Sequence, residues 1–326
     1  MPARMLTALR ALTACAGAFA IMPSPIHAEV WPERNVRIVT SFPAGTGGDI
    51  SARLYAKRLT QRWDKPVIVE NKPGADGILA VMAVLGARDS HTLLYTNDGP
   101  ITTNAFNHEK LPYDAARELV PISSGADVSI AVSVPASLKI ESLADFVAYA
   151  RSQPGKLNWG ATTGALDYIV PGFLKSAGLE LTRVSYKEIV PALQDLSEAR
   201  IHLYVSALAS QLGMVRNGNI KVLSVTNRER SALIPEVRTT AEAGFTDLAL
   251  EGFLGFFAPQ DMSKAVVDRI GADIREAGTD PGINARLSSS GLVARTNTAA
   301  EFAAIIERER AKVAAFAQDA GVKARP

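Results

Sequence analysis

The fold is decided by the stretch Val36-Arg37-Ile38-Val39-Thr40-Ser41-Phe42-Pro43-Ala44-Gly45-Thr46-Gly47-Gly48-Asp49-Ile50. Its apolar first half predicts a strand that ends at Phe42-Pro43, and after three glycines Asp49 opens a helical pattern that runs to about Trp63. A glycine turn that leads into a helix leaves backbone N–H groups unpaired, and the helix dipole makes that place attractive to an anion. The stretch indicates either capture of a small anion, such as a carboxylate, or a simple reversal of the chain.

The rest of the chain alternates short apolar strands with helical patterns, which indicates α/β units with parallel sheets. Strands are expected at Val36–Ser41, Val67–Glu70, Leu93–Tyr95, Ile130–Val134, Val184–Tyr186, His202–Val205, Val222–Val225 and Phe253–Phe257. Helices are expected at Asp49–Trp63, Ile78–Leu85, Leu143–Arg151, Tyr168–Ala177, Val190–Glu198, Gln211–Val215, Lys264–Ala277, Ile283–Ser288 and Ala299–Ala317. The pairs Ser142 with Asp145 and Thr298 with Glu301 have capping-box spacing.

Two stretches, around Asp127–Val134 and Leu250–Phe257, are long enough to cross between two lobes. A chain that crosses twice builds its first lobe from both ends, and a few hinge residues can then absorb a closing motion.

Residues 1–28 have the features of a secretory signal peptide. Arg4 and Arg10 form a positive start, an apolar run follows, and cleavage is expected after Ala28. The apolar run is shorter than the about 20 residues that span a bilayer. Lipid attachment at Cys15 is the alternative, although Arg10 lies too close to Cys15 for a proper apolar segment.

Composition narrows the function classes. The chain has 35 basic and 33 acidic residues, and loss of the two leader arginines makes the formal net charge zero. A nucleic-acid partner would need a concentrated basic face. The one cysteine lies in the leader, and the remaining histidines show no H-E-x-x-H spacing, so we expect no thiol nucleophile, zinc site or other cofactor. Neither G-x-S-x-G nor a P-loop occurs, and we expect no enzymatic activity.

A series of short motifs in a fixed order resembles the Bug-type solute-binding receptors of tripartite tricarboxylate transporters. The motifs are Trp31-Pro32, Phe42-Pro43-Ala44-Gly45 with Gly48-Asp49, Val69-Glu70-Asn71-Lys72-Pro73-Gly74-Ala75 with Gly77, Leu111-Pro112-Tyr113-Asp114, Pro154-Gly155-Lys156-Leu157-Asn158, Tyr186-Lys187, Pro191-Ala192-Leu193, Pro235-Glu236-Val237, Thr240-Ala241-Glu242-Ala243-Gly244 and Phe256-Phe257-Ala258-Pro259. They cover nearly the whole chain after the leader.

The resemblance implies an α/β fold of the two-lobed type II periplasmic binding protein class, with a hinged central cleft. It implies a first lobe from residues 29–127 and 250–326 and a second from 128–249. The implied ligand-binding residues are Ala44, Gly45, Thr46, Gly47, Gly48, Asp49, Gly74, Ala75, Asp76, Thr96, Asn97 and Asp98 in the first lobe, and Ala161, Thr162, Thr163, Gly164, Tyr168 and Ser206 in the second.

The second lobe departs from the family pattern at several of these places. The clamp loop Gly160–Ala165 is one residue shorter than usual, and Tyr168 stands where the family often has His. Ser206-Ala207 replaces an Asp, often followed by Asn, after the strand at Ile201–Val205. The loss of this carboxylate favours a less polar ligand or one with a second anionic group, and it leaves open that nothing is bound tightly.

Several residues have two interpretations. Asp49 faces the ligand or complements the helix dipole, and Asp98 binds a ligand cation or water or forms a turn with Gly99. Tyr168 contacts the ligand or is buried in its helix, and Thr162 and Thr163 are clamp hydroxyls or ordinary turn residues.

The resulting expectation is a monomeric periplasmic receptor that captures a small organic acid by lobe closure and delivers it to a tripartite tricarboxylate transporter. The alternative is a loaded sensor that signals to a membrane kinase. Both require the same closure, so the sequence does not separate them.

Overall fold

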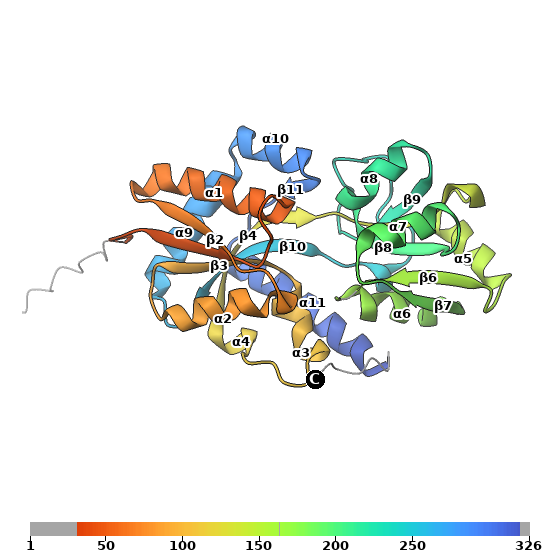
Figure 1. The fold of residues 1–326 in the computed structure, drawn as a ribbon, viewed down its shortest axis with the longest axis horizontal. Helices are drawn as coiled ribbons and strands as arrows, with labels where there is room; N and C mark the ends of the chain where they lie inside the picture. Colours follow the sequence, from red (N-terminus) through yellow and green to blue (C-terminus); the bar gives the residue numbers. More distant parts are fainter. Residues whose placement is uncertain (1–30, 163, 320–326) are drawn as a thin grey trace, which may run out of the picture. The chain divides into compact units, whose positions relative to one another are not determined.

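Residues 31–162 and 164–319 are described by the computed structural model (Figure 1). The description below concerns the compact unit that begins at Pro32. The expected leader with its cleavage site at Ala28, the alternative lipid site Cys15 and the clamp residue Thr163 lie outside the described residues.

The first sheet has the strand order β11-β4-β10-β3-β1-β2. Its strands are β1 (Val36–Thr40), β2 (Val67–Asn71), β3 (Thr92–Asn97), β4 (Leu119–Val128), β10 (Gly252–Pro259) and β11 (Leu292–Ala294). The helices that pack beside it are α1 (Gly47–Trp63), α2 (Ile78–Ala87), α9 (Lys264–Gly278) and α10 (Pro281–Ser289). A buried apolar cluster that includes Val39, Val81, Leu94 and Phe257 joins this sheet to α2.

The second sheet has the order β7-β6-β8-β5-β9. Its strands are β5 (Ile130–Pro135), β6 (Leu157–Ala161), β7 (Leu181–Ser185), β8 (Leu203–Ala207) and β9 (Ile220–Val225). Its helices are α5 (Leu143–Arg151), α6 (Leu166–Ser176), α7 (Ile189–Ser197) and α8 (Leu208–Arg216). The largest apolar cluster lies between this sheet and α5 and α6, with Phe146, Trp159 and Phe173 among its members.

The expectation of parallel sheets is only partly right. β1, β2 and β3 run parallel, as do β6, β7 and β8, but β10 is antiparallel to β3 and β5 is antiparallel to β8. The cause is the path of the chain. β4 ends at Val128 and β5 begins at Ile130, so the chain enters the second sheet at the edge where β8 ends, and β10 returns to the first sheet beside the end of β3.

Several elements differ from the sequence expectation. β4, β6 and β11 were not expected as strands at these bounds, and β7 ends at Ser185, whereas a strand at Val184–Tyr186 was expected. Short turns of helix also appear: α3 (Asn104–Asn107), α4 (Ala115–Glu118), and the single turns Ala75–Gly77, Gly99–Thr103, Ala136–Leu138 and Thr246–Leu248. The capping box at Thr298 is complete, since Glu301 N–H donates to Thr298 Oγ1 and Thr298 N–H donates to Glu301 Oε2. At Ser142 half of the box forms: Asp145 N–H donates to Ser142 Oγ, and the Asp145 carboxylate accepts from the Ser142 hydroxyl.

The last described helix, α11 (Ala299–Asp319), packs against β4 of the first sheet and against α6, a helix of the second half (Figure 1). Phe302 and Ile306 belong to the apolar cluster of the first sheet, whereas Val313 belongs to that of the second. Lys312 Nζ also donates to the carbonyl oxygen of Thr246, 3.0 Å away. The helix therefore ties the two halves of the fold together independently of the crossing strands.

Candidate functional site

Three loops of the first sheet meet at one edge, because β1, β2 and β3 are parallel neighbours and all end there. Ser41, just after β1, lies 2.8 Å from Thr96 at the end of β3, hydroxyl to hydroxyl. Asn71, at the end of β2, donates from Nδ2 to the carbonyl oxygen of Phe42, 3.0 Å away. The structure thus brings together the first-lobe residues that the sequence proposed for ligand binding.

The start of α1 presents backbone donors at this edge. Thr46 precedes the helix but does not cap it, because its hydroxyl donates to the Pro43 carbonyl oxygen, 2.8 Å away. The N–H groups of the first turn, which begins at Gly47, therefore have no side-chain acceptor among the described residues. Unpaired donors at a helix N-terminus form a place where an anion is stabilised.

Glycine is required at Gly48 by close packing. A Cβ atom there would lie 2.4 Å from the ring of Phe42, well inside contact distance. Gly45 has φ +81°, a backbone conformation that side-chain-bearing residues rarely adopt. These two positions explain why the sequence places glycines around the turn.

Asp49 holds this loop in shape. Its side chain is nearly fully buried and accepts hydrogen bonds from the Gly45 N–H at 2.9 Å and from Asn71 Nδ2 at 2.7 Å, beside an ion pair with Arg53. Burial alone would raise the pKa of this carboxyl, but the bonds from Arg53, Asn71 and Gly45 outweigh burial and lower the pKa. These contacts fix the loop before α1 to the end of β2.

The turn after β2 has an unusual backbone. Gly74, Ala75, Asp76 and Gly77 all have positive φ, at 118°, 47°, 51° and 85°. Two of these residues carry side chains, and such backbone strain tends to gather at functional sites. The turn is tied down because Asn104 Nδ2 donates to the Asp76 carbonyl oxygen at 3.0 Å.

Asp98 follows β3 and begins the short turn of helix at Gly99–Thr103, which bears out the turn interpretation of its backbone. Its carbonyl oxygen accepts from the N–H groups of Ile101 and Thr102. Burial raises the pKa of its carboxyl to about 6, against a smaller opposing effect of a hydrogen bond from its own backbone N–H. Asn97 and Thr96 precede it, and Thr96 is fully buried.

In the second sheet, the expected clamp residues lie at the ends of β6 and β8. Ala161 is buried at the end of β6, Thr162 is half-buried, and Gly164 has φ +128°. Ser206 is buried within β8, and its hydroxyl accepts a hydrogen bond from Gln211 Nε2 at 3.0 Å. The structure therefore gathers these residues at one edge of the second sheet.

Tyr168 has a defined place away from solvent. It lies in the first turn of α6, is buried, and donates from its hydroxyl to Asn107 Oδ1, 2.7 Å away. Its ring also packs edge-on against Phe106, with the ring centroids 6.4 Å apart. This bears out burial in its helix, and the pairing joins the second sheet's helix α6 to α3, which precedes β4.

A second contact between the two halves lies beside the α1 turn. A Cβ atom built on Gly47 would lie 3.5 Å from the carbonyl oxygen of Ser290. The next residue, Gly291, approaches Ala209 at the start of α8 so closely that a Cβ atom would lie 2.2 Å from the Ala209 Cβ. Because Ser206 lies three residues before Ala209, the α1 turn and the end of β8 are neighbours in space.

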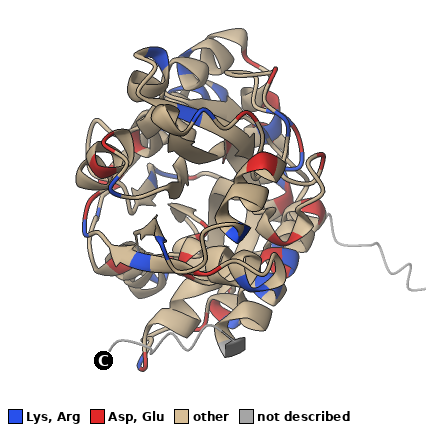
Figure 2. Ribbon diagram, turned by 90° about the vertical axis from the view of Figure 1, so that its right-hand side faces the viewer, with Lys and Arg blue, Asp and Glu red and all other residues tan. Residues whose placement is uncertain are grey.

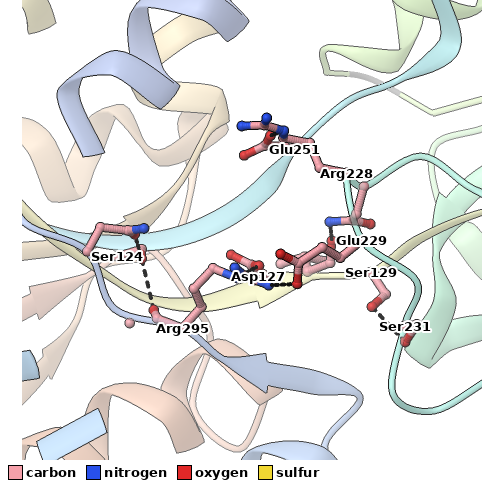
Figure 3. A network of polar contacts seen from close by, with 12 residues as sticks. Ser124, Asp127, Ser129, Arg228, Glu229, Ser231, Glu251 and Arg295 are labelled. Atoms are coloured by element: carbon pink, nitrogen blue, oxygen red, sulfur yellow. Dashed lines mark hydrogen bonds and ion pairs between the residues drawn. The ribbon is translucent and has the colours of Figure 1, made fainter. Parts of the chain in front are cut away.

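Sequence reasoning missed a polar network at the crossing point of the chain (Figure 3). Arg295, after β11, pairs with Asp127 of β4 and with Glu229, 2.6 Å away in the connection after β9. Burial raises the pKa of Asp127 to about 6, against the opposing influence of Arg295. A cavity of about 570 Å³ adjoins this network, and none of the ligand-binding residues proposed from the sequence lines it. The signals in the sequence were the two expected crossing stretches, which contain Asp127 and Glu251 of the cavity lining.

Charges of both signs are interspersed over the described elements (Figure 2). Within the described residues there is no cluster of three or more His, Cys, Asp or Glu side chains arranged to hold a metal ion. The same residues contain no helix with the length and apolar character needed to cross a membrane.

Residues 51–322 match the family described as tripartite tricarboxylate transporter family receptor. The chain belongs to this receptor family. Among relatives of the receptor, a UPF0065 protein from the tcbD–tcbE intergenic region of Pseudomonas sp. (strain P51) is 29% identical over 81% of this chain and 80% of its own length. Protein BugT of Bordetella pertussis is 26% identical over 84% of each chain. The Bug-type resemblance is thus confirmed.

Solved structures show the same fold. The receptor superposes on R. palustris Rpa4515 with adipate at a TM-score of 0.74, with 27% identity over 90% of this chain and 100% of the other. A TctC solute-binding protein from Polaromonas gives a TM-score of 0.78 at 18% identity, covering 89% of this chain and 99% of the other. The expected two-lobed periplasmic binding protein fold is confirmed, with the two sheets as the bases of its lobes.

Proposed function

We propose that the protein is a receptor that captures a small organic acid between its two sheets. The observation that carries the proposal is the uncapped first turn of α1, whose N–H groups open onto the edge where β1, β2 and β3 end. Hydrogen bonds to a charged acceptor contribute about 1.5–3 kcal/mol each. Donors that the fold already holds in place lose little entropy when a carboxylate binds. The bound adipate in the related R. palustris protein supports the same ligand chemistry.

The two lobes of the proposal are residues 29–127 with 250–326, and residues 128–249. The first sheet takes its strands from both ends of the chain, and β4 and β10 pair along their lengths beside the crossing point. Limited proteolysis with and without ligand tests the division. Ligand should protect the connections near Ser129 and Glu251 more than sites within either sheet.

The direct test is a thermal-shift screen of the chain from Glu29 against a panel of organic acids. A ligand at 100 times its dissociation constant adds about 2.7 kcal/mol to the free energy of unfolding. At roughly 2–4 °C per kcal/mol for a chain of this size, the melting temperature should rise by several degrees. If the protein unfolds cooperatively and no acid raises its melting temperature, the proposal is contradicted.

Gly47→Val tests the place of binding. The valine side chain would stand over the first turn of α1, beside Ser290, and should weaken binding of the acid found in the screen at least tenfold. Gly86→Val is the matched control, since Gly86 lies in α2 with nothing within 4 Å of its Cβ position. If the two variants bind the acid with equal affinity, the ligand does not bind at the first turn of α1.

The receptor family also supports a working location and partner. We place the mature protein in the periplasm as a monomer, after removal of the leader, where it delivers its ligand to the membrane components of a tripartite tricarboxylate transporter. Pull-down from membranes with and without the acid tests this. Ligand-dependent capture of a sensor kinase instead would favour the signalling alternative.

A further inference from the structure

The connection that follows β9 is hydrogen-bonded to the stretch where the chain crosses from β4 to β5. The side-chain amide of Asn227 bonds this stretch twice, because Ile130 N–H donates to its Oδ1 at 3.1 Å and its Nδ2 donates to the Val128 carbonyl oxygen at 3.0 Å. Ser129 Oγ donates to Ser231 Oγ at 2.9 Å (Figure 3). The connection is therefore anchored at two points beside the crossing stretch.

Between these anchors, two adjacent residues of opposite charge pair with residues of the first half (Figure 3). Glu229 Oε2 accepts from Nη2 of Arg295, which follows β11, at 2.6 Å. Arg228 Nε lies 3.7 Å from Oε1 of Glu251, which precedes β10. Two ion pairs of opposite polarity thus join the connection of the second sheet to two strands of the first.

The two sides of these ion pairs differ in how firmly they are held. The side chains of Arg228 and Glu229 are 74% and 71% exposed, whereas those of Glu251 and Arg295 are 19% and 38% exposed. On the first-half side, Glu251 also accepts from Arg308 of α11 at 2.9 Å, and Arg295 also pairs with a carboxylate of β4. The first half therefore presents two fixed, oppositely charged sockets.

The exposed partners have room to leave these sockets. The cavity of about 570 Å³ beside the network is lined by all four residues of the two ion pairs. Exposed side chains regain water when they separate, so each pair contributes only modestly to stability. Contacts of this strength suit a balance between two arrangements better than a permanent link.

We propose that Arg228 and Glu229 form a latch that favours the arrangement in which the two halves meet, and so raises the fraction of closed receptor before ligand binds. The ion pairs occur together with the close approach of Gly291 to Ala209, so they belong to that arrangement. The inference rests on the proposed function, because a latch matters only where lobes open and close. Apparent affinity falls in proportion to the fraction of binding-competent protein, so these residues tune capture without touching the ligand.

Spin labels test the latch without any ligand. The chain from Glu29 has no cysteine, so cysteines introduced at exposed Lys57 of α1 and exposed Lys156 before β6 are the only labelled positions. Pulsed electron paramagnetic resonance then gives the distances between the two halves. In Glu229→Gln, the ratio of the distance in the structure to all other distances should fall about two- to fivefold, which corresponds to loss of one partly exposed ion pair.

Ionic strength separates a latch from a packing effect. The difference between wild type and Glu229→Gln should be largest at about 0.01 M salt, where the Debye length is about 30 Å. At about 1 M salt, where the Debye length is about 3 Å, the wild type should show the distances of the variant. A difference of the same size at both salt concentrations overturns the latch.

Arg230→Gln is the matched control. Arg230 lines the same cavity and pairs with Glu242 at 2.9 Å, but both residues lie in the connection between β9 and β10, so this pair does not join the halves. Its distances should equal those of the wild type. Equal distances in wild type and Glu229→Gln at low salt overturn the latch, and so do equal changes in Glu229→Gln and Arg230→Gln.

Calorimetry with adipate as the probe links the latch to capture. Glu229→Gln should bind adipate about two- to fivefold more weakly than the wild type at low salt, and Arg230→Gln should bind it like the wild type. Equal affinity in all three proteins, when the wild type binds adipate, overturns the latch. If the wild type does not bind adipate, the spin-label distances alone decide on the latch, and the organic-acid panel decides separately on the proposed function.

Discussion

Replacing Gly291 by alanine should weaken ligand capture without touching the ligand. Gly291 lies between α10 and β11 in the first half of the fold and meets Ala209 of α8 in the second half. A Cβ atom at this position would lie 2.2 Å from the Ala209 Cβ and 2.9 Å from its Cα. Because packed carbon atoms sit about 3.5–4.0 Å apart, the two segments must separate by roughly 1.5 Å.

The size of the effect follows from this overlap. Inserting a methyl group where there is no room typically costs about 1–3 kcal/mol. On the proposed hinged closure, rotation at the crossing strands would relieve the clash in the open state, so the penalty would fall on the state in which the lobes meet around the ligand. At about 1.4 kcal/mol per tenfold change, affinity should fall roughly 5- to 140-fold.

A matched variant separates the clash from backbone strain. Gly291 has φ +74°, and Gly178, which follows α6, has φ +64° with nothing within 4 Å of its Cβ position. Alanine at either position therefore carries a similar left-handed backbone penalty of about 1–2 kcal/mol, but only Gly291→Ala introduces the overlap. Urea unfolding should give similar losses of stability for the two variants.

Calorimetric titration with the acid that gives the largest thermal shift completes the test. Gly291→Ala should bind it more weakly than Gly178→Ala, which should bind like the wild type. If the two variants bind equally well, contact between Gly291 and Ala209 has no part in capture and the reasoning is refuted. If Gly291→Ala alone is strongly destabilised without ligand, the two halves do not separate as a hinged fold should.

Two carboxylates give opposite pH dependences of stability. Asp49→Asn should lower the free energy of unfolding by about 1–3 kcal/mol at pH 7, since an amide cannot accept from both Gly45 and Asn71. The pKa of Asp49 is lowered in the folded protein, so the difference in unfolding free energy between wild type and variant should shrink as pH falls through that pKa. A difference that urea titrations show to be independent of pH would count against the role of Asp49 in holding the loop. Glu309 is buried with Oε2 unpaired within the described chain, and burial raises its pKa to about 7. The folded protein favours the neutral carboxyl, so the contribution of Glu309 to the free energy of unfolding is present at low pH and is lost as pH rises towards 7. At pH 8, Glu309→Gln should therefore be more stable than the wild type by roughly 1–3 kcal/mol. Below about pH 5 the variant should show no gain. A gain of the same size at both pH values would rule out this titration as its cause.

Local signals in the sequence were enough to place most elements. The glycine turn before Asp49, the apolar strand before it and the helix caps Ser142 and Thr298 each act over a few residues, and the structure has all of them. The convergence of the first-lobe residues also followed from sequence, because parallel strands that end in consecutive loops must end at one edge.

β4 was hidden because its polar residues looked like a loop. Ser123, Ser124 and Gly125 interrupt the apolar pattern of Leu119–Val128. In the structure Ser124 donates to the Arg295 carbonyl oxygen at 2.8 Å, and Ser123 accepts from the Asn297 N–H at 3.1 Å. Partners more than 170 residues away satisfy these groups, and no local pattern reveals such partners.

The sequence by itself determined the family, the α/β character and the glycine turn at the start of α1, because these depend on neighbours in the chain. The tertiary structure decided which side chains are already occupied. It bonded Asp49 to its own loop, paired Tyr168 with Asn107 and brought Gly291 against Ala209. Each of these outcomes depends on atoms that lie close in space and, apart from the Asp49 contact, far apart in sequence. Whether a polar group is free for a ligand therefore becomes visible only once the chain is folded.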